Sequence, residues 1–189
     1  MLTLGINTSQ AASDLAIIRG DTVLAESLDT VMQGQDERLP ALLDQLISQA
    51  GVTLSDLNRI AVVTGPGSFT GIRIGVAFAR GLALALRIDC VGISSLEAGI
   101  DPKDRSRLSA ALPAKKRPPD KTWWIQTLNS GIGTDEVTEL TESEVGEVVH
   151  ATPRALWAAQ KSASLEASKH PPAPIYARQP DAKPMKPPA

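Results

Sequence analysis

The sequence contains few of the residues on which metal sites, disulfides and histidine chemistry depend. Its 189 residues include one cysteine and two histidines, and only 3% are aromatic. The single cysteine, Cys90, excludes an internal disulfide and indicates a reducing compartment. His150 and His170 lie near proline-rich sequence, and we interpret both as solvated surface residues. Because the usual ligands and bases are so scarce, we predict no metal site and no catalytic residue.

The chain also lacks a strong charge of either sign and a targeting signal. Its formal net charge of −2 gives no overall case for nucleic-acid binding. Met1 leads directly into a strand-like run, without the basic residues and apolar core of a signal peptide. Arginines interrupt the longest apolar segment, which argues against a membrane span. We therefore expect a cytoplasmic protein with no membrane partner, large enough for one domain or two small lobes.

The most distinctive stretch, residues 62–86, has the pattern of a strand, a glycine turn and a helix. The turn matches neither a Walker A loop, nor the dinucleotide fingerprint, nor a nucleophile elbow. A helix start after such a turn can nevertheless bind an anion, so a phosphate loop and a purely structural turn both stay open, with the turn favoured. The candidate phosphate or nucleotide residues are Gly65, Gly67, Ser68 and Thr70 in this turn, and Asn7, Thr8 and Ser9 after the first strand.

The helix that follows the turn is apolar on nearly every side. Gly71, Gly75 and Ala79 recur every four residues and leave one side with almost no side-chain bulk. The charged residues form one stripe with a spacing of seven, made of Arg73, Arg80 and Arg87. Such a helix is buried on both sides, either in the core of its own domain or against a partner. The sequence alone does not decide between these two kinds of burial.

The order of the elements predicts an α/β fold. Strands are expected over residues 2–6, 11–19 and 22–29, followed by a helix over 33–50, the strand–turn–helix stretch, a strand over 87–93 and a helix starting at Ser94. This order predicts a ribonuclease-H-like mixed sheet flanked by helices, as in the actin, sugar-kinase and Hsp70 group. The helix over 33–50 has a clean apolar face that includes Leu39, Leu42, Leu43 and Leu46.

After residue 100 the sequence indicates a short, degenerate second lobe. A segment over 101–121 has a net charge of +4 and is either a solvated loop or a phosphate- or RNA-facing patch. Residues 107–112 and 122–128 are expected to pair as a hairpin, with a further strand over 137–140 and a final helix over 152–169. We therefore divide the chain into an N-terminal lobe, 1–98, a reduced second lobe of hairpin and helix, 99–170, and an extended proline-rich tail, 171–189.

Several motifs, taken in this order, resemble one bacterial family. The longest is Gly65-Pro-Gly-Ser-Phe-Thr-Gly-Ile-Arg-Ile-Gly. The others are Glu37-Arg-Leu-Pro, Ala79-Arg-Gly-Leu-Ala, Val91-Gly-Ile-Ser-Ser-Leu-Glu-Ala, Pro174-Ile-Tyr-Ala-Arg and Asp181-Ala-Lys-Pro. Together they resemble the TsaB (YeaZ) family of tRNA threonylcarbamoyladenosine biosynthesis proteins, which have an actin-like fold. The match is good over residues 1–98, weak over 100–170 and partial near the end.

The resemblance implies a non-catalytic scaffold subunit. Such proteins dock, helix against helix, onto the related catalytic subunit TsaD in a complex that also contains the ATPase TsaE. That complex places a threonylcarbamoyl group on the adenosine beside the anticodon of tRNAs reading ANN codons. The resemblance thus implies TsaD-type and TsaE-type partners, a homodimer when alone, and indirect tRNA contact. The docking surface would map onto Leu39, Leu42, Leu43, Leu46, Gly71, Arg73, Ile74, Gly75, Phe78, Ala79 and Leu82.

The sequence departs from the family at the end of its first strand. Family members usually carry an aspartate there, at the position that binds the metal-nucleotide in active relatives, and this chain has Asn7. A neutral amide does not compensate a magnesium-nucleotide as a carboxylate does, so we expect no cofactor of its own. ATP or ADP with magnesium, bound through the assembled complex, stays open. The alternatives are an ATP-hydrolysing or nucleotide-binding enzyme of the actin-like fold and a peptidase-like protein using Ser68.

Overall fold

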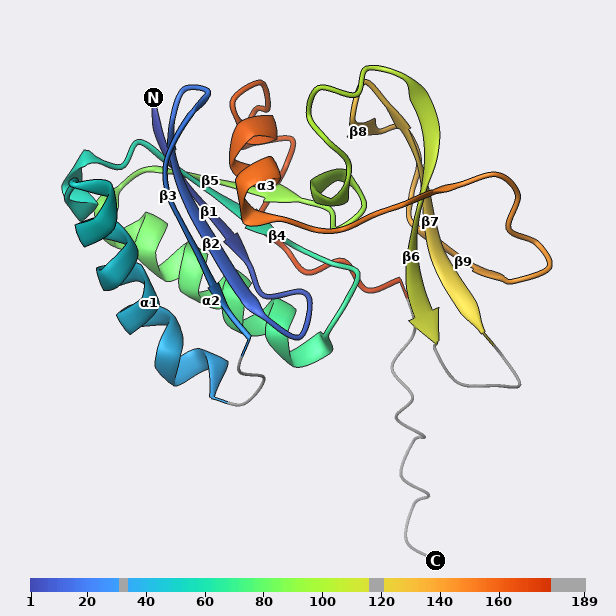
Figure 1. Cartoon of the computed structure of the whole chain (residues 1–189), viewed down its shortest axis with the longest axis horizontal. Coiled ribbons are helices and arrows are strands. Elements are labelled where there is room, and N and C mark those ends of the chain that lie inside the picture. Colours follow the sequence, from blue (N-terminus) through green and yellow to red (C-terminus); the bar gives the residue numbers. More distant parts are fainter. Residues whose placement is uncertain (31–33, 116–120, 178–189) are drawn as a thin grey trace, which may run out of the picture.

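The computed structural model describes residues 1–30, 34–115 and 121–177, and its main sheet has five strands. The strands are β1 (Leu2–Asn7), β2 (Ser13–Arg19), β3 (Thr22–Asp29), β4 (Arg59–Val63) and β5 (Asp89–Ile93). Their order is β3-β2-β1-β4-β5, with β1 antiparallel to β2 and parallel to β4 (Figure 1). This mixed sheet confirms the predicted ribonuclease-H-like architecture.

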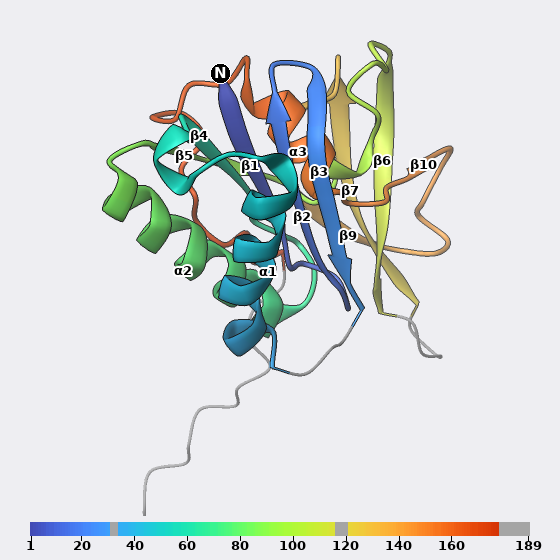
Figure 2. The same ribbon diagram turned by 60° about the vertical axis from the view of Figure 1, so that its left-hand side comes forward.

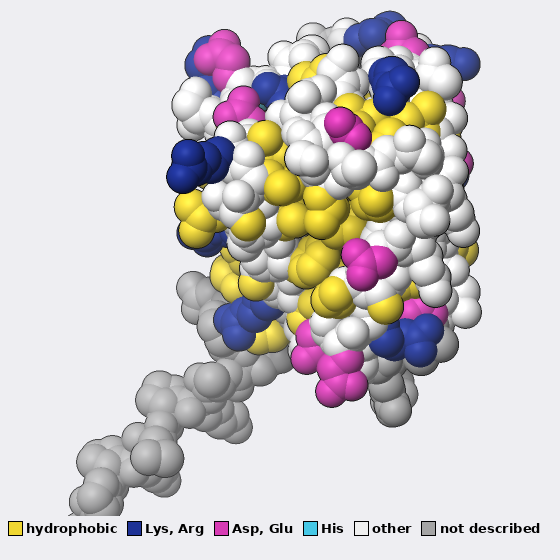
Figure 3. Space-filling model, turned by 90° about the vertical axis from the view of Figure 1, so that its left-hand side faces the viewer, with side chains coloured by type: hydrophobic (Ala, Val, Ile, Leu, Met, Phe, Trp, Pro, Cys, Tyr) yellow, Lys and Arg dark blue, Asp and Glu magenta, His cyan; other side chains and the backbone are white. Residues whose placement is uncertain are grey.

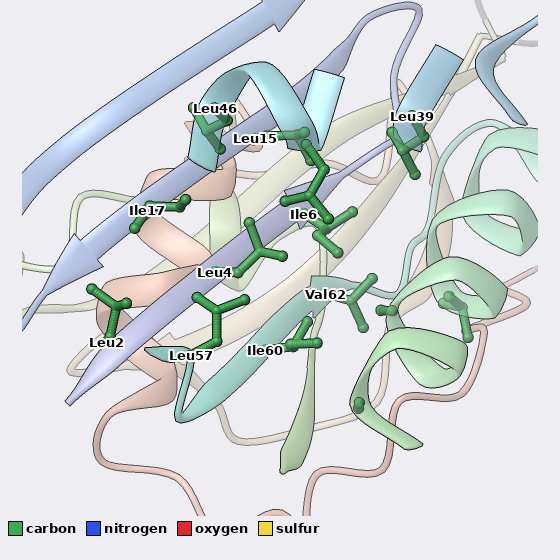
Figure 4. Close-up of a cluster of buried hydrophobic side chains, with 14 of the residues drawn as sticks. Leu2, Leu4, Ile6, Leu15, Ile17, Leu39, Leu46, Leu57, Ile60 and Val62 are labelled. Carbon is green, nitrogen blue, oxygen red and sulfur yellow. The ribbon is translucent and has the colours of Figure 1, made fainter. Parts of the chain in front are cut away.

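Helices cover both faces of this sheet. The helices α1 (Gln35–Ala50) and α2 (Phe69–Leu86) lie on one face, and α3 (Ala155–Ser162) lies on the other (Figure 2). Because both faces are covered, β1 is buried along its whole length. The larger core lies between the sheet and the α1–α2 layer and includes Leu4, Ile6, Leu39 and Leu46 (Figure 4).

The second lobe contains a second sheet, in which two long strands, β6 (Arg107–Lys115) and β7 (Thr122–Asn129), are joined by three short ones. The short strands are β8 (Ile132–Gly133), β9 (Thr138–Thr141) and β10 (Val149–His150). The predicted hairpin is present as the antiparallel β6–β7 pair, and the predicted third strand is β9, which pairs with β7. Residues 116–120 of the basic segment lie outside the described residues.

Two predicted helices are shorter than expected. The helix expected from Ser94 is a single 3₁₀ turn, η2 (Glu97–Gly99), although Ser94 and Glu97 exchange the hydrogen bonds of a capping box. The helix expected over 152–169 is only α3, which begins after the extended N-cap residue Arg154 and ends before the C-cap residue Ala163. An isolated helix of this length is marginal in water, so α3 depends on tertiary packing.

The same helix is also placed differently from the expectation. The sequence analysis assigned it to the second lobe, but it packs against β1, β2 and β4 of the first sheet. Gly5 on β1 makes this approach close, since a Cβ there would lie 2.1 Å from the carbonyl oxygen of Ala155. The predicted boundaries at residues 98 and 170 stay a prediction.

The end of the described chain returns to the first sheet. Gly92 donates its backbone N–H to the carbonyl of His170 at 2.9 Å, and Ile175 donates to the carbonyl of Thr64 at 2.8 Å. Residues 171–177 form neither helix nor strand, whereas residues 178–189 of the predicted tail lie outside the described residues.

Among the described residues, α2 alone is long and apolar enough to span a membrane by length and composition. A core helix passes the same test, and α2 packs against α1, β1, β4 and β5. The helix is therefore accounted for within the fold.

Candidate functional site

The glycine turn between β4 and α2 is held against the end of β1. Ser68 is the N-cap of α2, and its Oγ accepts a hydrogen bond from the backbone N–H of Gly71 at 3.2 Å. The backbone N–H of Ser68 donates to the carbonyl of Ser9 at 2.8 Å. Ser68 therefore uses its side-chain oxygen to cap α2. Thr70, another of the candidate phosphate-loop residues, is exposed in the first turn of α2.

The polar residues after β1 are turned into the protein. Asn7 accepts hydrogen bonds at its Oδ1 from the N–H and Oγ–H of Ser9, and its Nδ2 donates to the carbonyl of Pro153 at 2.9 Å. Thr8 donates from its Oγ1 to the carbonyl of Gly71 at 2.7 Å. Asn7, Thr8 and Ser9 are all buried. Thr8 and the backbone of Ser9 join the two segments of the candidate phosphate loop to each other, whereas Asn7 binds Ser9 and Pro153.

A magnesium-nucleotide does not fit this arrangement. The two segments do meet in space, as the sequence analysis required, but their buried side-chain polar groups are hydrogen-bonded to protein groups. Asn7 offers no carboxylate to a metal, and its amide is already used at both ends. Over the described ranges, no three His, Cys, Asp or Glu side chains come together as metal ligands. The geometry favours the structural turn over a nucleotide loop of this chain alone.

A cleft of about 650 Å³ opens between the first sheet and the second lobe, and Asn7 at the end of β1 is one of its lining residues. Asp14 and Glu26 contribute carboxylates to its wall, and Arg154 forms an ion pair with Glu26 at 2.8 Å. Burial raises the pKa of Asp14, while the hydrogen bond from the backbone N–H of Ala155 lowers it. With two carboxylates and one guanidinium, this wall is a poor environment for a polyphosphate.

The α1–α2 face divides the predicted docking residues into two groups. The first group is buried in the core of this chain: Leu39, Leu43, Leu46, Gly71, Gly75 and Ala79. The second group is exposed or half-buried at the surface: Leu42, Arg73, Ile74, Phe78 and Leu82. For Gly75 the reason is direct, because a Cβ there would lie 2.1 Å from the Oγ1 of Thr8. The small-residue stripe therefore faces the protein's own sheet, which corrects its assignment to a partner surface.

The outer side of α2 carries apolar side chains that the sequence analysis did not select. Leu84 is 82% exposed, and Phe69, the first residue of α2, is 51% exposed. Figure 3 shows hydrophobic side chains gathered on the side of the molecule that carries α1 and α2. Helical spacing from Arg73 would have identified Leu84, since residues eleven apart lie on the same side of a helix. We call the exposed side of α2, with Arg73, Ala77, Arg80 and Leu84, the outer α2 face.

Comparison with known proteins gives consistent matches. A family model described as "TsaD: tRNA N6-adenosine threonylcarbamoyltransferase" matches residues 30–108. The TsaB protein of Bacillus subtilis is 38% identical over 97 residues, which are 51% of this chain and 42% of that protein. The TsaB protein of Escherichia coli is 30% identical over 156 residues, covering 79% of this chain and 65% of that protein. The chain thus spans less than two thirds of the length of these two relatives.

Solved structures agree on the fold. YeaZ from Pseudomonas aeruginosa superimposes with a TM-score of 0.70 at 21% identity, covering 93% of this chain and 99% of that structure. This likeness extends over the second lobe, where the sequence resemblance was weak. With the curated TsaB relatives, it shows that the chain is a TsaB/YeaZ-like protein.

Proposed function

We propose that this chain is a non-catalytic subunit in the biosynthesis of threonylcarbamoyladenosine in tRNA. In this role it docks onto a TsaD-type threonylcarbamoyltransferase and activates it. A TsaE-type ATPase joins the same complex, and tRNA contacts this chain only through the complex. The observation that supports the proposal best is the outer α2 face, where exposed apolar side chains, among them Leu84 at 82%, alternate with arginines.

The composition of this face supports a protein partner. Ala77 and Leu84 are exposed on a helix with no acidic residue, while Ile74 and Phe78 lie half-buried at its margin. Contiguous apolar surface on a folded protein marks an interaction site more often than chance exposure does. The relatives named TsaB and the matching TsaD family model indicate which partner to test first.

The local chemistry of the glycine turn supports a non-catalytic role. Ser68 uses its hydroxyl oxygen to cap α2. Asn7 uses its amide to bind the backbone N–H of Ser9 and the carbonyl of Pro153. No specific observation favours the peptidase or the ATP-hydrolysing alternative. ATP or ADP with magnesium enters this proposal only as a ligand of the assembled complex.

The test uses Leu84→Glu with Val149→Glu as the matched control. Both replace an exposed apolar side chain by the same charge, but Val149 is 45% exposed on β10 in the second lobe. Each purified variant is mixed with the TsaD-type subunit from the same organism, and complex formation is measured by light scattering and titration calorimetry. We expect Leu84→Glu to weaken the complex by about tenfold or more, as for a central interface residue, and Val149→Glu to leave it unchanged.

The same mixtures are then assayed for tRNA modification. Modification that depends on this chain and falls with Leu84→Glu supports the proposal. A wild-type chain that forms no complex with the TsaD-type subunit refutes it. Equal affinity of the two glutamate variants would place the docking surface elsewhere. Light scattering of the chain alone shows whether a second copy occupies the same face.

A further inference from the structure

The C-terminal segment ends, within the described chain, on the first turn of α2. Its hydrogen bonds to Gly92 and Thr64 carry it across the ends of β5 and β4. Tyr176 then reaches Arg73, which precedes it by 103 residues, and its hydroxyl accepts a hydrogen bond from Nε of Arg73 at 3.0 Å. We call the three residues Phe69, Arg73 and Tyr176 the aromatic clasp.

The clasp holds the guanidinium of Arg73 in one position. Its Cζ lies 3.7 Å from the ring centroid of Phe69 and 5.6 Å from that of Tyr176. The two rings are 5.6 Å apart and tilted by 43°. A cation over aromatic faces gains electrostatic stabilisation, and the hydrogen bond at Nε fixes the direction of the fork. Neither Nη group has a hydrogen-bond partner among the described residues, so both stay available to a ligand.

This fixed cation has no counter-charge within the described chain. Arg73 forms no ion pair with any described residue, and α2 contains no acidic residue. Elsewhere on the surface, Arg38 and Arg154 do pair with carboxylates, at 2.6 Å and 2.8 Å. A pre-oriented guanidinium edge has the geometry for two parallel hydrogen bonds to a carboxylate.

The clasp is continuous with the outer α2 face. Arg73, Ala77 and Leu84 are all exposed and lie on one side of the helix. Phe69 and Tyr176 are 51% and 52% exposed, so about half of each ring is available for contact. Aromatic residues and arginine are the types most often found at the energetic centre of protein interfaces. A partner helix lying on the outer α2 face would therefore meet the clasp at one end.

We propose that the aromatic clasp anchors the partner subunit by binding a carboxylate on the partner's surface, with Arg73 as the residue that selects for it. The proposal rests on the proposed function, since its occupant is the TsaD-type subunit. It adds a defined chemical requirement, an acidic side chain beside an apolar helix face. A protein carboxylate fits better than an RNA phosphate, because two half-exposed aromatic rings flank Arg73 and the next arginine on this face, Arg80, is two helical turns away.

The test compares Arg73→Gln with Arg107→Gln. Both arginines are exposed, but Arg73 belongs to the clasp on α2, whereas Arg107 lies on β6 in the second lobe. We expect Arg73→Gln to raise the Kd for the TsaD-type subunit by about tenfold or more and Arg107→Gln to leave it unchanged. Tyr176→Phe keeps the ring and loses the hydroxyl, so a smaller loss of about threefold is expected. Melting curves check that every variant is folded.

The outcomes separate this inference from the proposed function. If the wild-type chain binds the TsaD-type subunit and Arg73→Gln binds as tightly as Arg107→Gln, the clasp proposal is overturned and the proposed function stands. If Arg73→Gln keeps its affinity for the protein but lowers the affinity of the complex for tRNA, the site binds a phosphate and the proposal is overturned. If the wild-type chain does not bind the TsaD-type subunit, both proposals fail together.

Discussion

Replacing Gly75 by alanine tests the inward orientation of the small-residue stripe. Gly75 lies in the middle of α2, and the Cβ of an alanine there would be 2.1 Å from Oγ1 and 3.3 Å from Cβ of Thr8. Thr8 is fully buried, and its Oγ1 donates to the carbonyl of Gly71 at 2.7 Å. The added methyl group must displace either this hydroxyl or the helix.

The expected cost follows from three contributions. Overpacking a well-packed core costs about 1–3 kcal/mol. Displacing the Thr8 hydroxyl from its acceptor leaves a buried polar group without its partner, which costs about 1–3 kcal/mol. Alanine in place of glycine inside a helix stabilises the folded state by about 1 kcal/mol. We therefore expect Gly75→Ala to lower the free energy of unfolding by about 2–4 kcal/mol and Tm by about 5–15 °C for a chain of this size.

The matched control is Gly81→Ala on the same helix. Gly81 is exposed, and a Cβ there meets no atom within 4 Å. Only the helix-propensity gain remains, so this variant is expected to be more stable than the wild type by about 0.5–1 kcal/mol. Urea unfolding followed by circular dichroism measures both variants against the wild type under identical conditions.

A double variant identifies the contact that causes the loss. Thr8→Ala removes the oxygen that clashes, so Gly75→Ala should cost less in that background, with a coupling energy of about 1–3 kcal/mol. If Gly75→Ala is as stable as Gly81→Ala, the stripe does not pack against β1 as described.

Three further predictions follow from other buried groups. Lys161 is 8% exposed, its Nζ donates to two backbone carbonyls, and burial lowers its pKa to about 8. Above pH 8 the unfolded chain therefore binds more protons than the folded chain, so the free energy of unfolding should rise between pH 8 and pH 9 by at most about 1.4 kcal/mol. Lys161→Met should remove this rise, as measured by urea unfolding. Burial raises the pKa of the Cys90 thiol to about 11, so iodoacetamide at pH 8 should modify the folded chain far more slowly than the urea-unfolded chain. Asn7→Asp should lower the free energy of unfolding by about 1–3 kcal/mol, because a carboxylate cannot donate a hydrogen bond to the carbonyl of Pro153. Adding magnesium-ATP should not restore the Tm of this variant. A restored Tm would show that the carboxylate alone recreates a nucleotide site.

Sequence patterns predicted the first sheet and its two long helices because these elements carry strong periodic signals. The strands before residue 30 and the helix at 69–86 follow hydrophobic repeats that depend only on local spacing. The length of η2 and the ends of α3 were missed. Both depend on what the segment packs against, and that information is not local.

The candidate site shows the same limit more sharply. A stripe of Gly71, Gly75 and Ala79 predicts a close neighbour but does not say which neighbour. The structure supplies Thr8, from a strand more than sixty residues earlier in the chain. Likewise, the clasp depends on Tyr176 reaching α2 from the far end of the sequence, a contact that spacing cannot reveal. The family resemblance maps the docking surface onto α1 and α2, and this stays a prediction, whereas the structure places Gly75 on the side of α2 that faces Thr8.

The position of α3 has a consequence for biosynthesis. The inner face of the first sheet is covered only when α3 packs there, through Ala155, Leu156 and Ala159 against Ala16 and Ile18. The ribosome therefore finishes all five strands of that sheet while its covering helix is still unmade. About sixty more residues separate β5 from α3, which at ordinary elongation rates is a delay of about 3–12 s. During that interval the nascent chain exposes an apolar sheet face.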